Sequence, residues 1–224
     1  STLAQAKALS KNPDPLTACR PFDADRDGFV MGEGGGAIIL ETEEHARKRG
    51  AKILCSLAGY GNNTDGYHVT APRPDGSGAV SCMQSALRKA NMKPEDIGYI
   101  NTHGTSTPVG DPVEVAAIKT LYGWEDKEPM PDDLKSKIPP VSSTKGNTGH
   151  LMGAGGITEV IACIKAIETG ILPPTLNYHT PDPACDLDFI PEGPRKTQIT
   201  AAMSNALGFG GQNSSIIVKK YEAE

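Results

Sequence analysis

The sequence lacks any apolar run that approaches the ~20 residues of a membrane span, and its N-terminus lacks the basic-then-apolar order of a signal peptide. We therefore expect an intracellular protein without a membrane partner, cytoplasmic, with a mitochondrion or plastid as open alternatives. The chain also lacks an initiating methionine and begins at Ser1, so we expect a fragment. Its 224 residues, 38% of them hydrophobic, are still enough to bury a core.

Basic charge and paired cysteines are also scarce. The 22 Lys and Arg residues against 27 Asp and Glu give a net charge of −5. This balance argues against nucleic acid as a partner, because phosphate binding needs concentrated positive charge. The cysteine count is odd and no CxxC pair is present, so nothing indicates zinc binding or redox exchange. We expect free thiols at Cys19, Cys55, Cys82, Cys163 and Cys185.

Short apolar runs alternate with helical periodicity from residue 51 onward, which is typical of an α/β sheet. The predicted strands are 52–60, 97–100, 141–143, 187–190, 200–205 and 214–220. The predicted helices are 77–91, 112–122 (capped by Asp111) and 157–169, with a surface loop over 123–140. The predicted order is therefore βαβαβα followed by two strands. Residues 1–50 instead indicate a short helix, a Pro-rich turn and a strand pair, as the tail of a preceding domain would.

Three familiar motifs are incomplete. Residues 23–34 carry aspartates at alternate positions, as a calcium loop does, but end in Gly34 where a glutamate is needed. The run GEGGGA at 32–37 has dinucleotide-binding spacing, yet a strand-like run follows it instead of a helix, so we interpret it as a bend between two strands. The run VSSTKGNTGHLMGAGG at 141–156 lacks the glycine that a phosphate loop needs before its lysine.

Two histidines follow neighbouring predicted strands. His103 lies in INTHGTSTPVGD, and His150 lies in SSTKGNTGH, five residues after Lys145. Residues at the carboxyl ends of neighbouring strands converge on one crevice in an open α/β sheet, so these side chains are candidates for a single site. One such histidine more often satisfies backbone groups near a turn, but two of them beside a lysine favour a site. Two neutral imidazole N–H groups aimed at one carbonyl oxygen would stabilise an enolate or a tetrahedral oxyanion.

The segments THGTSTPVGD, SSTKGNTGHLMGAGG and NALGFGGQNSS resemble the β-ketoacyl-[acyl carrier protein] synthases, the thiolase-fold condensing enzymes of fatty acid synthesis, and most closely the synthase II type. The resemblance extends through CRPFDADRDGFVMGEG and covers nearly the whole chain. It implies an α/β thiolase-like fold. Residues 51–224 would form the C-terminal βαβαβαββ half, with a mixed sheet between helical layers, and residues 1–50 a remnant of the N-terminal half.

The resemblance also implies an acyltransferase reaction, the decarboxylative Claisen condensation of an acyl thioester with malonyl-carrier, without a redox cofactor. By resemblance His103 and His150 stabilise the enolate that forms when malonyl-carrier loses carbon dioxide. Lys145 matches the family lysine that pairs with a glutamate, here Glu159, and orients the site. The physical argument from the two imidazoles and the family resemblance therefore lead to the same chemistry.

Further residues match binding positions of the family. Thr105 and Thr107 match threonines that hydrogen-bond the pantetheine arm, and Phe209 matches the gating phenylalanine of the GFGG loop. Some family members hold a structural monovalent cation, K⁺ or Na⁺. The matching positions here are Asn101, Glu159, Ser204 and Asn205.

The family's nucleophilic cysteine lies in a DTACSSA-like segment of the N-terminal half, and this chain has no such segment. Cys19 lies in LTACR, in the family's RPFD region, well after the nucleophile. Cys163 lies in an apolar predicted helix, where burial raises the pKa of a thiol and makes it inert. We therefore expect this chain alone to be inactive in condensation.

The implied partners are an acyl carrier protein with acyl and malonyl thioesters, an N-terminal half bearing the nucleophilic cysteine, and a second copy in a homodimer of the complete enzyme. Two alternatives stay open. One is a non-catalytic partner of the chain-length-factor type, which the presence of both histidines and the lysine disfavours. The other is half of a polyketide-type ketosynthase. A thiolase acting on coenzyme A esters is disfavoured, because the C-terminal Gly-rich loop has no cysteine.

Overall fold

The computed structural model describes residues 2–5, 7–125 and 130–222. Its centre is a five-stranded sheet in the order β1-β7-β6-β2-β3. Strands β1, β7 and β6 are antiparallel neighbours, whereas β6, β2 and β3 run parallel, so the sheet is mixed. The strands are β1 (Ser56–Thr64), β2 (Tyr99–Asn101), β3 (Val141–Ser142), β6 (Ala201–Gly208) and β7 (Gln212–Lys219), with a separate small ladder of β4 (Ile171–Leu172) and β5 (Arg195–Lys196).

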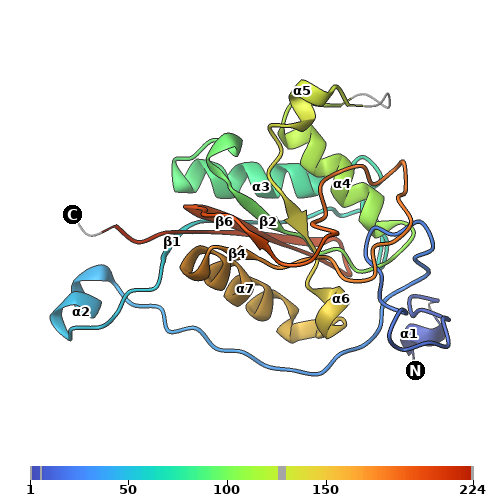
Figure 1. The fold of residues 1–224 in the computed structure, drawn as a ribbon, viewed down its shortest axis with the longest axis horizontal. Coiled ribbons are helices and arrows are strands. Elements are labelled where there is room, and N and C mark those ends of the chain that lie inside the picture. The colour runs from blue at the N-terminus through green and yellow to red at the C-terminus, as the bar shows by residue number, and fades with distance from the viewer. Residues whose placement is uncertain (1, 6, 126–129, 223–224) are drawn as a thin grey trace.

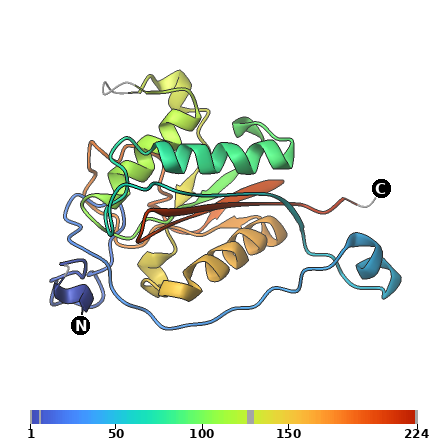
Figure 2. The same ribbon diagram turned by 180° about the vertical axis from the view of Figure 1, so that it is seen from behind.

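Helices cover both faces of the sheet (Figure 1). Helices α3 (Ser77–Ala90) and α4 (Gly110–Leu121) lie on one face, and α7 (Gly155–Thr169) lies on the other, as Figure 2 also shows from behind. The predicted fold class, a mixed sheet between helical layers, is confirmed. Within the five-stranded sheet the order is βαβαβα followed by two strands, and the small β4–β5 ladder is inserted before these two. The shorter helices are α1 (Thr2–Gln5), α2 (Glu43–Lys48), η1 (Pro94–Asp96), α5 (Asp132–Lys135), α6 (Lys145–Thr148) and η2 (Met152–Ala154). No helix among the described residues is long and apolar enough to cross a membrane.

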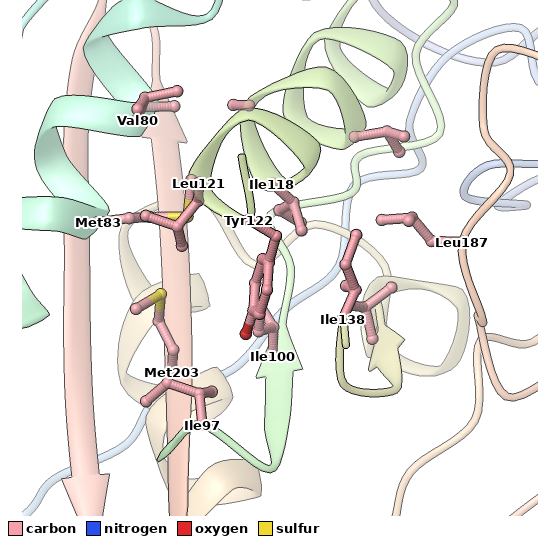
Figure 3. Close-up of a cluster of buried hydrophobic side chains, with 14 of the residues drawn as sticks. Val80, Met83, Ile97, Ile100, Ile118, Leu121, Tyr122, Ile138, Leu187 and Met203 are labelled. Carbon is pink, nitrogen blue, oxygen red and sulfur yellow. The ribbon is translucent and has the colours of Figure 1, made fainter. Parts of the chain in front are cut away.

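Two apolar clusters fill the space between the layers. The first cluster lies between the sheet and helices α3 and α4, where Met83 and Ile118 pack with Met203 of β6 (Figure 3). The second cluster lies under α7, where Val160 packs with Ala202 of β6. Because Ala202 and Met203 are consecutive, they face opposite sides of the sheet, and the period of two along the strand explains the separation of the clusters.

Helix α3 follows its predicted pattern closely. Its buried residues are spaced three and four apart, and the helix ends at Asn91, which adopts the left-handed conformation with φ of 52°. The helix lies very near β1, because a Cβ atom at Gly61 would stand 2.0 Å from the carbonyl oxygen of Cys82. The first βα unit therefore depends on this glycine for its packing.

Three sequence-based predictions of elements were wrong in detail. The first strand of the sheet begins at Ser56, not at residue 52. Residues 187–190 form no strand, because their backbone hydrogen bonds go to two separate segments. The carbonyl oxygen of Asp188 accepts from the N–H of Val141, and that of Phe189 accepts from the N–H of Thr175. The predicted loop 123–140 contains the short helix α5. Part of that predicted loop, residues 126–129, lies outside the described residues.

The predicted cap of α4 was also wrong. The helix begins at Gly110, so Asp111 lies within its first turn and is completely buried. The Asp111 carboxylate instead accepts from the backbone N–H groups of Phe22 at 2.8 Å and Thr107 at 3.3 Å. It therefore ties the N-terminal segment of the chain to the loop that precedes α4.

Residues 1–50 form no strand pair where the structure describes them. Residues 32–42 are extended and pass beneath α7 without a neighbouring strand, so this segment has helix α7, not a ladder, beside it (Figure 1). Residues 8–31, in contrast, are joined to the rest of the chain. Arg26 donates to Asp182 at 2.6 Å and to the carbonyl oxygen of Thr107 at 3.1 Å, and Phe22 stacks on Phe189 with ring centroids 4.2 Å apart.

Candidate active site

A cavity of about 480 Å³ opens beside the carboxyl ends of β2 and β3. His103 follows β2, and Lys145 and His150 follow β3, and all three line the cavity. The structure thus brings together the three side chains that the sequence selected. The ring centroids of the two histidines are 5.4 Å apart and the rings are nearly perpendicular, at 84°.

Both histidine rings have a donor at Nδ1. Nζ of Lys145 lies 3.4 Å from Nδ1 of His103, and the backbone N–H of Met152 donates to Nδ1 of His150 at 3.1 Å. An ammonium and a backbone N–H can only donate, so Nδ1 accepts in each ring. The proton of each neutral imidazole is therefore assigned to Nε2, which leaves each ring with one donor for a ligand in the cavity.

The electrostatics of the cavity favour the neutral rings. Burial lowers the pKa of His103 well below its ordinary value, and the positive charge of Lys145, together with that of His150 whenever this ring is protonated, adds to the effect. Burial and, secondly, Lys145 lower the pKa of His150 to about 4. At neutral pH both imidazoles are therefore uncharged N–H donors.

Lys145 is almost completely buried and ion-paired. Its Nζ donates to Oε1 of Glu159, which lies on α7, and to the carbonyl oxygen of His103 at 2.6 Å. Burial raises the pKa of Glu159, and the ammonium of Lys145 opposes this shift. The pair joins α7 to the end of β2, so it sets the position of His103.

A second buried carboxylate, Glu114 of α4, holds the His103 loop and was missed by the sequence analysis. Its two oxygens accept from the backbone N–H groups of His103 and Gly104, each at 2.8 Å. Burial raises the pKa of Glu114 to about 7, and these two N–H groups oppose the rise. A signal was available, since Asp111, Glu114 and Ile118 share one helical stripe, and an acid on a core-facing stripe needs a buried partner.

Gly104 is required where this loop passes the N-terminal segment. Its φ is +33°, and an added Cβ would lie 2.7 Å from Cβ of Ser143 and 2.8 Å from the ring of Phe22. The hydroxyl of Ser143 donates to the carbonyl oxygen of Gly104 at 2.6 Å. Residues after both strands are thus locked to each other directly behind His103.

The backbone of His150 is held by residues near the N-terminus. The N–H of His150 donates to the carbonyl oxygen of Val30 at 2.7 Å, and the N–H of Gly32 donates to the carbonyl oxygen of His150 at 3.0 Å. The ring of Phe29 stands edge-on to that of His150, with centroids 5.1 Å apart. Residues 29–32 thus fix the second histidine as α4 fixes the first.

Comparison with known families matches two adjoining parts of the chain. Residues 54–179 match the model described as "Beta-ketoacyl synthase, C-terminal domain". Residues 1–46 match the model described as "Beta-ketoacyl synthase, N-terminal domain". The chain belongs to the β-ketoacyl synthase family. The resemblance read from the sequence is therefore confirmed.

Relatives and solved structures agree with this assignment. The chain is 50% identical over 218 residues to "3-oxoacyl-[acyl-carrier-protein] synthase 2" of Staphylococcus aureus (strain COL), which covers 97% of this chain and 50% of that protein. This ketoacyl synthase chain thus spans about half the length of the curated relatives that it matches. A structure described as "The ishigamide ketosynthase/chain length factor" aligns with a TM-score of 0.87 at 36% identity, over 99% of this chain and 50% of that one.

A further solved structure carries a carrier protein. It is described as "type II PKS acyl-carrier protein in complex with its ketosynthase bound to the hexaketide". It aligns with this ketoacyl synthase chain with a TM-score of 0.90 at 37% identity, over 99% of this chain and 52% of that one.

The two selected threonines of this ketoacyl synthase chain also line the cavity. The hydroxyls of Thr105 and Thr107 lie 3.0 Å apart and are hydrogen-bonded to each other, and Oγ1 of Thr107 also accepts from the N–H of Gly110. Their side chains are thus held at the start of α4, on the same loop as His103.

Phe209 lines the same cavity from the turn between β6 and β7, and 47% of its surface is exposed. The turn is fastened to the loop that follows β1. The N–H of Gly210 donates to the carbonyl oxygen of Val69 at 2.6 Å. The N–H of Asp65 donates to the carbonyl oxygen of Gly211 at 2.7 Å. The phenylalanine therefore stands at the mouth of the cavity on an anchored turn.

Three of the four residues selected for a cation lie on one side of the sheet. Asn101 and Ser204 are register partners on β2 and β6, and they share the α7 face with Glu159. Oδ1 of Asn101 and Oε2 of Glu159 are buried without a hydrogen-bond partner among the described residues. Asn205 differs, because its side chain lies on the opposite face, where its Oδ1 accepts from Ser215 at 2.8 Å.

Proposed function

We propose that this chain is the C-terminal half of a 3-oxoacyl-[acyl carrier protein] synthase and supplies the decarboxylation part of its active site. The observation that carries the proposal is the histidine pair, whose ring centroids are 5.4 Å apart and whose Nδ1 atoms both accept. Two uncharged Nε2–H donors in one cavity suit an oxygen that gains negative charge during the reaction. Such an oxygen develops on the thioester carbonyl of a malonyl group when carbon dioxide leaves.

The reaction follows from this placement. A malonyl thioester binds with its thioester carbonyl oxygen facing Nε2–H of His103 and His150. The bond between the α-carbon and the carboxylate carbon breaks, and carbon dioxide leaves. The electron pair of this bond stays on the α-carbon side and forms an enolate, whose oxygen accepts both hydrogen bonds. The α-carbon then attacks the carbonyl carbon of an acyl group held on a cysteine of the N-terminal half, and that thiolate leaves. A 3-oxoacyl thioester remains on the carrier.

Lys145 and Glu159 act in this proposal by positioning. The ammonium donates to both the backbone and the ring of His103, so it keeps the ring oriented and Nδ1 occupied. The same positive charge, beside both rings, disfavours their protonation. Lys145 therefore keeps the histidines as neutral donors.

Thr105, Thr107 and Phe209 handle the carrier's arm in this proposal. The threonine hydroxyls offer donors and acceptors on the cavity wall, which suits the amides of a pantetheine chain. Phe209, at the mouth of the cavity, controls access to the histidines. These roles need the long, flexible thioester of an acyl carrier protein as the substrate.

A structural K⁺ or Na⁺ fits the α7 face of the sheet. The oxygens Oδ1 of Asn101 and Oε2 of Glu159 are buried and unpartnered among the described residues, and hard oxygen donors are what such cations bind. Ser204 is their neighbour on β6. A cation there would balance the charge of Glu159. From Asn205 only the main chain could take part, because its side chain bonds on the other face.

The N-terminal half is the partner that this chain needs. Residues 32–42 lie extended under α7 without a neighbouring strand, and Ile39 and Leu40 are 78% and 70% exposed. Apolar side chains on an unpaired extended segment suit a neighbouring sheet. We propose that the N-terminal half supplies it, together with the nucleophilic cysteine, and that two such complete units form a homodimer. The boundary at residue 50 stays a prediction.

The proposal is tested by mixing this chain with the N-terminal half expressed as a second polypeptide. Acyl carrier protein loaded with an acyl group, and a second carrier loaded with malonate, serve as substrates. We expect 3-oxoacyl-carrier and carbon dioxide only from the mixture. Neither product from a mixture shown by gel filtration to be assembled would contradict the proposal. A half of a polyketide-type ketosynthase is the second candidate, because the carrier-bound relative at 37% identity is of that kind; repeated condensation on one carrier would identify it.

A further inference from the structure

A chain of three hydrogen-bonding side chains lies on the α7 face of the sheet, behind the histidines. Tyr99 and Asn101 are two residues apart on β2 and therefore face the same side, and Ser142 stands beside them on β3. Nδ2 of Asn101 donates to the hydroxyl oxygen of Tyr99 at 3.1 Å, and this oxygen lies 2.7 Å from Oγ of Ser142. All three residues have 0% exposure.

The direction of these bonds follows from what each group can do. An amide nitrogen only donates, so the tyrosine oxygen accepts from Asn101. Its own proton is then available for Oγ of Ser142. The Asn101 amide is consequently turned with its nitrogen toward Tyr99 and its oxygen away. That oxygen, Oδ1, is one of four buried side-chain atoms that have no hydrogen-bond partner among the described residues.

Oε2 of Glu159, which lies on α7, is another buried oxygen without a hydrogen-bond partner among the described residues. Its other oxygen accepts from Lys145, which in turn donates to His103. Two buried acceptors without donors cost free energy unless a positive charge lies nearby. If the Asn101 amide were turned over, it would present a donor, and a donor repels a metal cation.

We infer that Tyr99 is a positioning residue for the monovalent cation, because it orients the Asn101 amide so that its oxygen faces the site. The inference rests on the cation site proposed above. It adds Tyr99 and Ser142 to that site as residues that do not contact the ion themselves. Ser142 completes the arrangement by accepting a hydrogen bond from the tyrosine hydroxyl. The β2 strand therefore carries both a ligand and the group that orients it.

The test measures thermal unfolding of the full chain in KCl, NaCl or choline chloride at equal ionic strength. We expect K⁺ or Na⁺ to raise the melting temperature of the unmodified protein above its value in choline. In Tyr99→Phe the cation concentration that gives half of this rise should increase about 10- to 100-fold, as for other residues that orient metal ligands. Ser142→Ala should shift it in the same direction.

Tyr122→Phe is the matched control. It also removes one buried tyrosine hydroxyl, which donates to the carbonyl oxygen of Pro94 at 2.8 Å, but it lies in the first cluster, on the other face of the sheet. It should lower the melting temperature and leave the cation dependence unchanged. If Tyr99→Phe does not fold, Ser142→Ala decides.

The outcomes separate the inference from the site on which it rests. An unmodified protein that melts equally in all three salts would show that no cation site exists, and both proposals would fail. A cation-dependent protein in which Tyr99→Phe and Ser142→Ala behave like Tyr122→Phe would keep the site and overturn the role of Tyr99.

Discussion

Lys145 contacts His103 twice, through the carbonyl oxygen at 2.6 Å and through Nδ1 at 3.4 Å. One buried ammonium thus sets both the backbone and the ring of a histidine that lies 42 residues earlier in the chain. Glu159 of α7 accepts a hydrogen bond from the same ammonium. The position of the histidine depends on this pair, and each prediction below follows from a contact of this kind.

Replacing either histidine should slow decarboxylation strongly. We expect His103→Ala and His150→Ala each to lower carbon dioxide release from malonyl-carrier by about 10²–10³ in the assembled protein, as the loss of one oxyanion donor does. Release is measured with labelled malonate. His45→Ala, on the exposed face of α2, is the control and should keep the full rate. A normal rate in both active-site variants would return these histidines to a structural role.

Breaking the buried ion pair should destabilise the fold. Lys145→Met leaves Glu159 buried without its cation, and we expect the free energy of unfolding to fall by about 3–5 kcal/mol. Urea denaturation measures the change. The exposed pair Lys165 and Glu168 supplies the comparison, since Lys165→Met should cost at most about 1 kcal/mol. Equal losses in the two variants would contradict the buried role of Lys145.

A double variant that changes both Lys145 and Glu159 tests whether the unpaired charge causes the loss of stability. Adding Glu159→Gln to Lys145→Met removes the uncompensated charge, so part of the lost stability should return. Decarboxylation should not recover, because His103 still lacks its support. A double variant no more stable than Lys145→Met would show that charge is not the cause.

His150 should make decarboxylation insensitive to pH near neutrality. Its pKa in the folded protein is about 4, below the ordinary 6.5, so between these values the unfolded chain binds more protons. Its contribution to stability is therefore complete above pH 6.5 and is lost as the pH falls through about 4. We expect His150 to add no inflection to the rate near pH 6.5, and we expect an NMR titration of its ring to have a midpoint near 4. A ring titration with its midpoint near 6.5 would contradict this.

None of the five cysteines should take an acyl group. Burial raises the pKa of Cys19 to about 11 and of Cys185 to about 12, and it also raises those of Cys55, Cys82 and Cys163. None of them lines the cavity in the part of the chain that the structure describes. Intact mass after incubation with an acyl thioester should be unchanged. An adduct on any of the five would overturn the assignment of the nucleophile to the N-terminal half.

The extended segment should matter for assembly. Leu40→Asp replaces an exposed apolar side chain of the segment 32–42 with a charged one. It should weaken binding to the N-terminal half by at least tenfold. Leu16→Asp changes a leucine outside the segment that is also exposed, at 82% against 70% for Leu40, and serves as the control. Binding is measured by titration calorimetry. Equal affinities for both variants would show that the N-terminal half docks elsewhere.

Sequence reasoning found the histidines because strand exits rich in Gly and Thr show where side chains can converge. It missed Glu114, because an acid within a helix is ordinarily exposed, and only the stripe shared with Ile118 marks it as buried. The family resemblance grouped Ser204 with Asn205, and alternation along β6 places their side chains on opposite faces of the sheet.

The errors in secondary structure have a common cause. The run at 187–190 and the segment at 32–42 are both apolar and extended, as strands are, but a strand also needs a neighbour with a continuous ladder of hydrogen bonds. Local sequence indicates whether a segment is apolar and extended, but it does not indicate whether the segment has a hydrogen-bonded neighbour. The segment at 187–190 has one backbone bond to Val141 of β3 and one to Thr175 of a loop, and the segment at 32–42 lies beside helix α7.

The bonds from Val30 and Gly32 to His150 have a practical consequence for anyone who divides this protein. The two family models meet between residues 46 and 54, which suggests that gap as the place to cut. A cut there would leave His150 on one fragment and the residues that align it on the other. The unit that must be kept whole for a working histidine pair begins before Phe29, inside the part that sequence families assign to the neighbouring domain.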